Sequence, residues 1–233
     1  MINVTKHMVA YIDILGSKDA ILHDHNDYYL NTINTCFERV KANTSWMRLS
    51  GTEGCTIKIF SDNIVIAIPS DFACVNNNHP TIVLNRMHAA LCAIQREFLK
   101  HEILIRGGLS FGKLYIDDIF IWGKALIDAY NVEDGIAIYP RIVIDQSIHV
   151  LNAYRPDPAE MYESNCIRAD FDGCYYFDYL RLSMHPENTE MRDLVENSMC
   201  STAQKISIEE NQRKLAKYQW HYNYLAECKS KWI

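Results

Sequence analysis

Two isolated aspartates, Asp13 and Asp62, are the residues of this chain best suited to chemistry. Asp13 lies in the apolar run 9–15, and Asp62 lies between the apolar runs 57–60 and 64–66. Ionised side chains are rare in such surroundings unless something pairs with them. Magnesium sites that handle nucleoside triphosphates usually combine one or two protein carboxylates with phosphate oxygens. The two acids therefore predict a clamp for divalent cations, although Asp62 taken alone is explained equally well as a turn residue.

The elements around each aspartate decide whether the two can meet. Residues 8–15 are expected to form a buried strand, and Asp62 is expected at the tip of a hairpin over residues 56–68. In a sheet that places this strand beside this hairpin, both acids lie at adjacent strand ends. Two metal ions held there would activate an attacking hydroxyl and stabilise a leaving pyrophosphate.

The turn after Asp13 is a second candidate for substrate binding. Ser17 is a plausible N-cap for a helix that runs to about Met47, with a possible break at 23–26. The turn formed by Leu15, Gly16 and Ser17 is expected to offer free backbone N–H groups at the positive end of this helix. Such a turn can cradle a triphosphate.

The remaining pattern predicts an α+β fold. The order strand, helix, strand, strand, helix, strand gives a ferredoxin-like βαββαβ core over about 8–180. A polar C-terminal helical extension follows over about 186–233, and 1–233 is expected to be a single domain. The further expected elements are a loop at 74–80, a helix at 81–100, two strands around a glycine-rich bend at 103–112 and 113–116, an apolar piece at 119–122, a helix at 123–133, and strands at 142–144 and 166–177.

Composition excludes several classes of function. The formal net charge is -6, which disfavours a nucleic-acid binder or a polybasic membrane-docking protein but not a nucleotide substrate. No apolar run reaches the roughly 18 residues that a membrane-spanning helix needs, so no membrane insertion is expected. The eight cysteines have no C-x-x-C spacing, and no signal peptide precedes them, which predicts reduced thiols in the cytoplasm. His23 and His25 lie in one polar stretch, which disfavours a zinc site.

Four segments together resemble the class III nucleotidyl cyclases over residues 8–135. They are the first metal motif at 11–16, the second metal hairpin at 58–62, the following strand at 105–112, and the Ile-Trp-Gly segment that opens the helix at 121–131. The resemblance implies that Asp13 and Asp62 are the catalytic metal ligands, that the carbonyl of Ile14 is a further ligand, and that two Mn²⁺ or Mg²⁺ ions are bound. It also implies a homodimer with two composite active sites, because class III sites lie between subunits.

The chain departs from the purine-specific members of that family. Those enzymes carry an asparagine and an arginine where Ile127 and Asn131 stand here, and Phe120 replaces a purine-sensing polar residue. Lys58 occupies a base-reading position, yet a strand lysine is also common at a surface. Asn131 remains a candidate for contacting the substrate of the partner subunit.

The sequence leaves two possible roles open for each of two basic residues, Arg106 and Lys124. Arg106 can contact a phosphate or the dimer interface, or it can form a salt bridge beneath the sheet. Lys124 can reach a phosphate across the dimer, or it can be solvated.

The amino-acid sequences of these motifs most resemble those of the pyrimidine cyclases of bacterial anti-phage (Pycsar) defence. Those proteins have Phe-Ser-Asp at the second metal site, Arg-Gly-Gly on the next strand, a W-G-x-A-L-I-x-A-Y-x-x-E helix and a K-Y-x-W signature, which correspond here to 60–62, 106–108, 122–133 and 217–220. This resemblance implies cyclisation of UTP, favoured over CTP, to the 3′,5′-cyclic monophosphate, which activates a separate effector. The alternatives are a catalytically inactive nucleotide-binding module, or an adenylate or guanylate cyclase with atypical transition-state residues.

Overall fold

The computed structural model of the chain describes residues 4–43, 54–70, 80–149, 167–181 and 187–231. Most of the expected loop at 74–80 lies outside these residues, and Pro80 begins a helix. The helix expected from Ser17 is broken as the sequence predicted, and residues 44–47 are not described. In chain order the elements are β1 (Thr5–Ile14), α1 (Ser17–Leu22), α2 (Tyr28–Asn43), β2 (Thr56–Phe60), β3 (Asn63–Pro69), α3 (Pro80–Leu99), β4 (Ile105–Ile116), β5 (Ile121–Trp122), α4 (Lys124–Gly135), β6 (Ile142–Ile144), α5 (Gln146–His149), β7 (Ile167–Ala169), β8 (Tyr175–Phe177), α7 (Thr189–Ile208) and α8 (Gln212–Ser230).

The sheet confirms the predicted ferredoxin-like core. Its strand order is β2-β3-β1-β4-β6-β8-β7, and β5 pairs with β4 outside this path. The first four strands in this order pair in an antiparallel manner, as a split βαβ arrangement requires. The register aligns Asp13 of β1 with Asn63 of β3 on one side and with Arg106 of β4 on the other.

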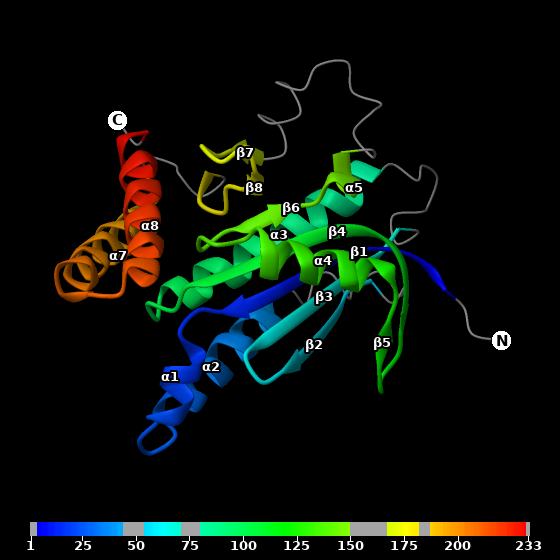
Figure 1. The fold of residues 1–233 in the computed structure, drawn as a ribbon, viewed down its shortest axis with the longest axis horizontal. Coiled ribbons are helices and arrows are strands. Elements are labelled where there is room, and N and C mark those ends of the chain that lie inside the picture. The colour runs from blue at the N-terminus through cyan, green and yellow to red at the C-terminus, as the bar shows by residue number, and fades with distance from the viewer. Residues whose placement is uncertain (1–3, 44–53, 71–79, 150–166, 182–186, 232–233) are drawn as a thin grey trace.

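Helices cover both faces of this sheet (Figure 1). Alternate residues of β1 and β3, such as Ile12 and Ile64, pack with α2 and α3 in the largest apolar cluster. The opposite residues, such as Val9 and Val65, pack under α4 through Ala125. Asp13 has the strand parity of Val9, so its side chain belongs to the α4 face of the sheet.

The prediction of two strands around a bend at 103–116 was wrong. The structure has one strand of 12 residues, β4, without a break. Gly107 and Gly108 do not form a turn; they allow neighbouring elements to pack closely against β4. A Cβ atom on Gly107 would lie 2.5 Å from the carbonyl oxygen of Tyr11, and one on Gly108 would lie 2.1 Å from that of Ala129. The two glycines therefore let β1 and α4 approach β4 closely.

The end of the chain adds a small hairpin and the predicted helical extension. Strand structure was expected over 166–177, and residues 167–177 form the two short strands β7 and β8, whereas Cys166 lies outside the described residues. Helices α7 and α8 lie side by side beyond the far end of the sheet (Figure 1). Trp220, Tyr224 and Leu225 of α8 enter an apolar cluster with Tyr176 of β8. None of the helices in the described ranges has the length and apolar character needed to cross a bilayer.

Candidate functional site

The structure brings Asp13 and Asp62 together at one end of the sheet. Asp13 is the penultimate residue of β1, and Asp62 lies in the turn between β2 and β3. The backbone N–H of Ile14 donates to the carbonyl oxygen of Asp62 across 3.1 Å, which fixes the end of β1 against this turn. The two carboxylates are close enough for the charge on Asp62 to raise the pKa of Asp13.

The Asp62 carboxylate accepts hydrogen bonds from the neighbouring side chains of Ser17, Asn63 and Ser61. The Ser17 hydroxyl donates to Oδ2 across 2.5 Å, and the Asn63 amide donates to Oδ1 across 3.0 Å. The hydrogen bond from Ser17 is the largest cause that holds the pKa of Asp62 below its usual range. Ser61 has a φ of 56°, so the hairpin turn contains a left-handed residue just before Asp62. The carboxylate is therefore ionised and oriented at neutral pH.

Asp13 is paired with Arg106, one of the two interpretations open from the sequence. The guanidinium Nε donates to Asp13 Oδ2 across 3.1 Å, while NH1 donates to the carbonyl oxygens of Glu133 and Ala137. The NH2 nitrogen lies 2.7 Å from Oε1 of Glu133. Burial raises the pKa of Asp13, and the hydrogen bond from Arg106 opposes this effect. In the single chain Arg106 thus links Asp13 of β1 to Glu133 of α4 through ion pairs with both.

Sequence reasoning gave no role in the site to two charged residues, Glu133 and Lys217, although both belong to motifs shared with the pyrimidine cyclases. Burial raises the pKa of Glu133 to about 7, and Arg106 opposes the rise. Burial lowers the pKa of Lys217, and Arg106 lowers it further, whereas Asp13 and Glu133 raise it. Helical spacing places Glu133 four residues after the buried Ala129, which is a pattern that can be recognised. The K-Y-x-W motif includes Lys217, but no pattern in the sequence predicts that this residue of α8 lies near Asp13.

Two tyrosines also flank the aspartates. Burial raises the pKa of Tyr11 to about 12 and that of Tyr29 to about 12, and in both cases Asp13 and Asp62 contribute to the rise. Both phenols are therefore neutral at physiological pH and can donate hydrogen bonds. Tyr11 packs edge-on against Tyr130 of α4 at a centroid distance of 5.4 Å.

The expected phosphate cradle is only partly available. The backbone N–H of Leu15 donates to the carbonyl oxygen of Leu104 across 2.9 Å, so the prediction of a free group there was wrong. Gly16 has a φ of 80°, a left-handed conformation that turns the chain directly into α1. The described residues supply no acceptor for the N–H groups of Gly16 and Ser17. Helix α1 has six residues, so its dipole is small.

Three of the predicted substrate-binding residues lie away from the aspartates. The Lys58 ammonium donates to the carbonyl oxygen of Asp118 across 2.7 Å, at the turn between β4 and β5. The Lys124 ammonium lies 2.5 Å from Asp128, one turn along α4, and is largely exposed. Asn131 is exposed on the same helix. Within one chain these residues do not contribute to the site.

The donor atoms around the aspartates fit a divalent cation. Carboxylate, hydroxyl and carbonyl oxygens are the ligands that Mg²⁺ and Mn²⁺ prefer. Arg106 donates to one oxygen of Asp13, Oδ2, which leaves lone pairs on that carboxylate, whereas Asp62 accepts from Ser17, Asn63 and Ser61 and has fewer lone pairs free. Within the described ranges no cluster of three or more His, Cys, Asp or Glu residues has metal-binding geometry. A site built on these two acids thus needs oxygens from another source, such as a polyphosphate.

Comparison with known proteins gives a result only at the level of structure. No protein-family model matches the chain, and no curated protein matches its sequence. The guanylyl cyclase domain, described as monomeric, of the RhoGC fusion protein from the aquatic fungus Blastocladiella emersonii matches with a TM-score of 0.54 at 15% identity, over 76% of this chain and 97% of that one. The catalytic core of a rhodopsin-guanylyl cyclase with converted specificity, in complex with ATPαS, matches with a TM-score of 0.51 at 15% identity over the same shares. The chain therefore has a mixed α+β fold similar to that of class III cyclase catalytic domains, extended by α7 and α8.

Proposed function

We propose that this protein is a nucleotide cyclase that converts a pyrimidine nucleoside triphosphate to its 3′,5′-cyclic monophosphate and pyrophosphate. UTP is favoured over CTP. The product acts as a second messenger in anti-phage defence by activating a separate effector. The observation that carries the proposal is the meeting of Asp13 and Asp62 at one end of a cyclase-like sheet. A cyclase-like domain that only bound a nucleotide, without catalysing a reaction, would have no need of two neighbouring carboxylates as metal ligands.

Asp13 and Asp62 are proposed as the ligands of two Mn²⁺ or Mg²⁺ ions, together with the carbonyl oxygen of Ile14. The ions supply charge stabilisation for the polyphosphate when they are bound. The Ser17 hydroxyl orients Asp62, and Arg106 orients Asp13. The N–H groups of Gly16 and Ser17 are proposed to contact phosphate oxygens.

The preference for a pyrimidine rests on the sequence resemblance and on α4. Ile127 and Asn131, which replace the asparagine and arginine of purine-specific enzymes, are both exposed on this helix. A partner subunit would therefore meet an apolar side chain and an amide, with no arginine at these positions. The same departure is what favours the second candidate function, a nucleotide-binding module without turnover.

A homodimer is proposed because apolar side chains gather on the outer surface around α4 and β5. Trp122 is 75% exposed and Ile127 is 58% exposed, and large exposed apolar surfaces often mark interfaces. Lys58, Lys124 and Asn131 lie on these same elements or beside them, so dimerisation can carry them to the partner's aspartates. Sedimentation velocity should show a dimer, and Trp122→Ser should shift it toward monomer. A monomeric wild-type protein that is fully active would refute the composite site.

The decisive experiment incubates the purified protein with each of the four ribonucleoside triphosphates and Mn²⁺ or Mg²⁺, with products identified by mass spectrometry. Asp62→Asn should lower turnover by more than about 100-fold, and Ser17→Ala by about 10-fold, because Ser17 only orients the ligand. The matched control is Glu190→Gln. It removes a carboxylate that is largely exposed and far from the site, where it pairs with Lys100, so activity should be unchanged.

Each outcome of this experiment separates the candidates. Cyclic UMP or cyclic CMP that disappears in Asp62→Asn establishes the proposal and identifies the base. A cyclic purine product supports the adenylate or guanylate cyclase alternative and rejects the pyrimidine assignment. Nucleotide binding without turnover, also in the presence of phage lysate as a source of a trigger, supports the binding module.

A further inference from the structure

A second cavity lies away from the two aspartates, between α8 and the β7–β8 hairpin. Its volume is about 440 Å³, within the range of small-molecule sites. Five of the side chains that line it are aromatic, and they come from three separate parts of the chain: Tyr139, Phe171, Tyr176, Trp220 and Tyr224. The function proposed above makes no use of it.

The aromatic side chains of this cavity pack against one another. Trp220 is stacked on Tyr139 with centroids 5.9 Å apart, and on Tyr224 with centroids 5.5 Å apart. The Trp220 indole N–H donates to Asp170 across 2.8 Å. Phe171, at the mouth of the cavity, packs against Tyr139 but is 75% exposed. Trp220, Tyr176 and Tyr224 are buried, so Phe171 is the lining ring with the most open surface on which a flat aromatic ligand can stack.

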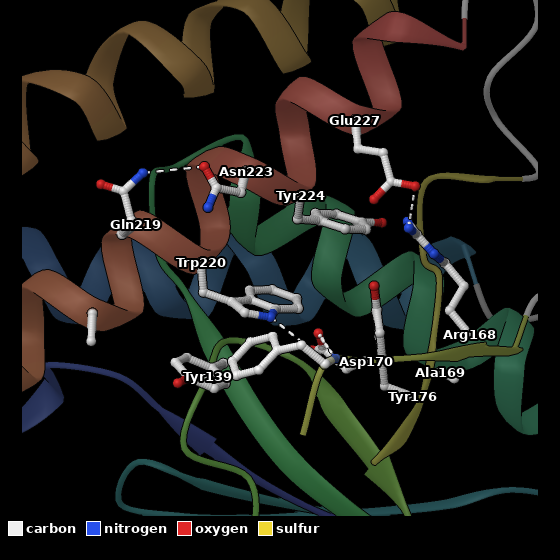
Figure 2. A pocket seen from close by; sticks show the side chains of 12 residues that line it. Tyr139, Arg168, Ala169, Asp170, Tyr176, Gln219, Trp220, Asn223, Tyr224 and Glu227 are labelled. Carbon is white, nitrogen blue, oxygen red and sulfur yellow. Dashed lines mark hydrogen bonds and ion pairs between the residues drawn. The ribbon is translucent and has the colours of Figure 1, made fainter. Parts of the chain in front are cut away.

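Two amide side chains line the same cavity from one face of α8. Gln219 donates to Asn223 across 3.1 Å, and Figure 2 shows this pair at one end of the cavity, above the Trp220 ring. After that bond the Gln219 oxygen and the Asn223 nitrogen have no partner among the described residues. The pair therefore presents one acceptor and one donor. This pattern complements a ring edge that carries adjacent N–H and C=O groups, or a similar pair.

The charged groups of the cavity argue against an anionic ligand. Arg168 pairs with Glu227 at the other end of the cavity (Figure 2) and also contacts Asp178. Asp170 is already bonded by Arg141 and by Trp220. The described lining thus carries one cation, Arg168, against two carboxylates, and that cation is satisfied. A phosphate group would find no free positive charge.

We propose that this cavity binds an uncharged planar heterocycle of the nucleoside type, which stacks on Phe171 beside the aromatic cluster and hydrogen-bonds the exposed amides of Gln219 and Asn223. The ligand belongs to the same chemical family as the proposed substrate but lacks the phosphates. The site is therefore separate from the one at Asp13 and Asp62.

Helix α8 also connects this cavity to the aspartates. Lys214 pairs with Asp19 of α1 across 2.9 Å, and Ser17, the first residue of α1, bonds Asp62. Lys217 approaches Asp13 from the same helix. A ligand that fixes α8 is expected to reduce the motion of α1. This regulatory consequence rests on the proposed function, whereas binding does not.

The test titrates uridine, cytidine, adenosine and guanosine, and their 5′-monophosphates, into the protein by isothermal calorimetry. At least one nucleoside should bind, and more tightly than its monophosphate. Asn223→Ala and Phe171→Ala should each weaken binding at least about tenfold, since each removes one recognition element. The control Gln204→Ala removes an exposed amide of α7 and should bind as the wild type does. Binding should persist in Asp62→Asn and in the presence of excess nucleoside triphosphate.

The outcomes distinguish this inference from the proposed function. Failure of every nucleoside to bind, tighter binding of the monophosphates, or displacement by a triphosphate would overturn the site. Unchanged binding in both Asn223→Ala and Phe171→Ala would overturn its location. Hydrogen exchange over α1 should slow when the nucleoside is bound, and an unchanged rate would overturn the link through α8. None of these readouts requires cyclase activity, so a protein that forms no cyclic product can still pass them.

Discussion

Replacement of Gly108 by alanine tests the closest contact in the fold, the one between β4 and α4. An added Cβ would lie 2.1 Å from the carbonyl oxygen of Ala129, 2.7 Å from Cβ of Val132 and 2.8 Å from the nitrogen of Glu133. Two of these three atoms belong to the helix backbone, which no rotamer change can move. Since ordinary contacts begin at 3.4 Å, α4 would have to move away by about 1.3 Å.

The expected cost follows from this displacement. Overpacking of this kind costs about 1–3 kcal/mol or more, and the loss of glycine flexibility in the unfolded chain returns about 0.4–1 kcal/mol. The shift also pulls Glu133 from Arg106, whose NH2 lies 2.7 Å from it. We expect Gly108→Ala to lose about 2 kcal/mol or more, which lowers the Tm by about 4–8 °C in a domain of this size.

Gly112 provides a matched control four residues along the same strand. A Cβ added there meets nothing closer than Ala125 Cβ at 3.6 Å, so Gly112→Ala should be neutral or slightly stabilising. Thermal unfolding followed by circular dichroism compares the two variants, and the cyclase assay should show a loss only for Gly108→Ala. If the two variants melt within about 1 °C of each other, the reasoning from the α4 contact is wrong.

Two further predictions concern buried titratable groups. Burial lowers the pKa of His221 to about 3, so folding favours the neutral ring, and stability present above pH 6.5 is lost as the pH falls. The contribution of His221 falls by about 1.4 kcal/mol between pH 7.5 and 5.5. Denaturant titrations should show this amount as the difference between the wild type and His221→Gln, because Glu133, whose raised pKa gives the opposite pH dependence, is present in both proteins. Equal changes in the two proteins would contradict this interpretation. Burial raises the pKa of Cys36 to about 11 and that of Cys228 to about 12, whereas Cys200 is exposed. Iodoacetamide at pH 8, with adducts mapped by mass spectrometry, should label Cys200 before Cys36 and Cys228, and labelling of Cys36 or Cys228 as fast as that of Cys200 would show that the fold is more open.

The order of the core elements could be predicted because each shows a clear local pattern. The apolar run 8–15 and the helical spacing at 81–100 match β1 and α3 to within a few residues. The fold class followed from their order, since a hairpin after a strand and helix has few places to pair. The break between α1 and α2 was marked by polar residues at 23–27.

The errors occurred where the role of a residue depends on contacts with distant parts of the chain. Gly107 and Gly108 resemble a turn locally, but their lack of Cβ atoms is required by β1 and α4. The sequence does signal the hairpin of β7 and β8, because Asp172 and Gly173 are typical turn residues. In the structure the Gly173 N–H donates to the carbonyl oxygen of Asp170 across 3.0 Å and closes this turn. Besides Asp13, Arg106 pairs with Glu133. This second contact depends on the position of α4 across the sheet, which the spacing of residues in the sequence does not predict.

The environment of Arg141 ties the C-terminal helix to the core. This arginine follows α4 and is 1% exposed. Its guanidinium pairs with Asp170 and Asp172, and it lies 5.3 Å from the ring centroid of Tyr139 and 5.7 Å from that of Trp220. Without α8 the charge would lose an aromatic cover, and Asp170 would lose the indole donor.

Core and extension should therefore unfold in one cooperative transition, with no stable intermediate in which α8 has detached. Such coupling also constrains how the protein can evolve. If recombination joined this core to another partner in place of α8, that partner would have to replace Trp220 as well, because the core buries a charge that the extension helps to cover.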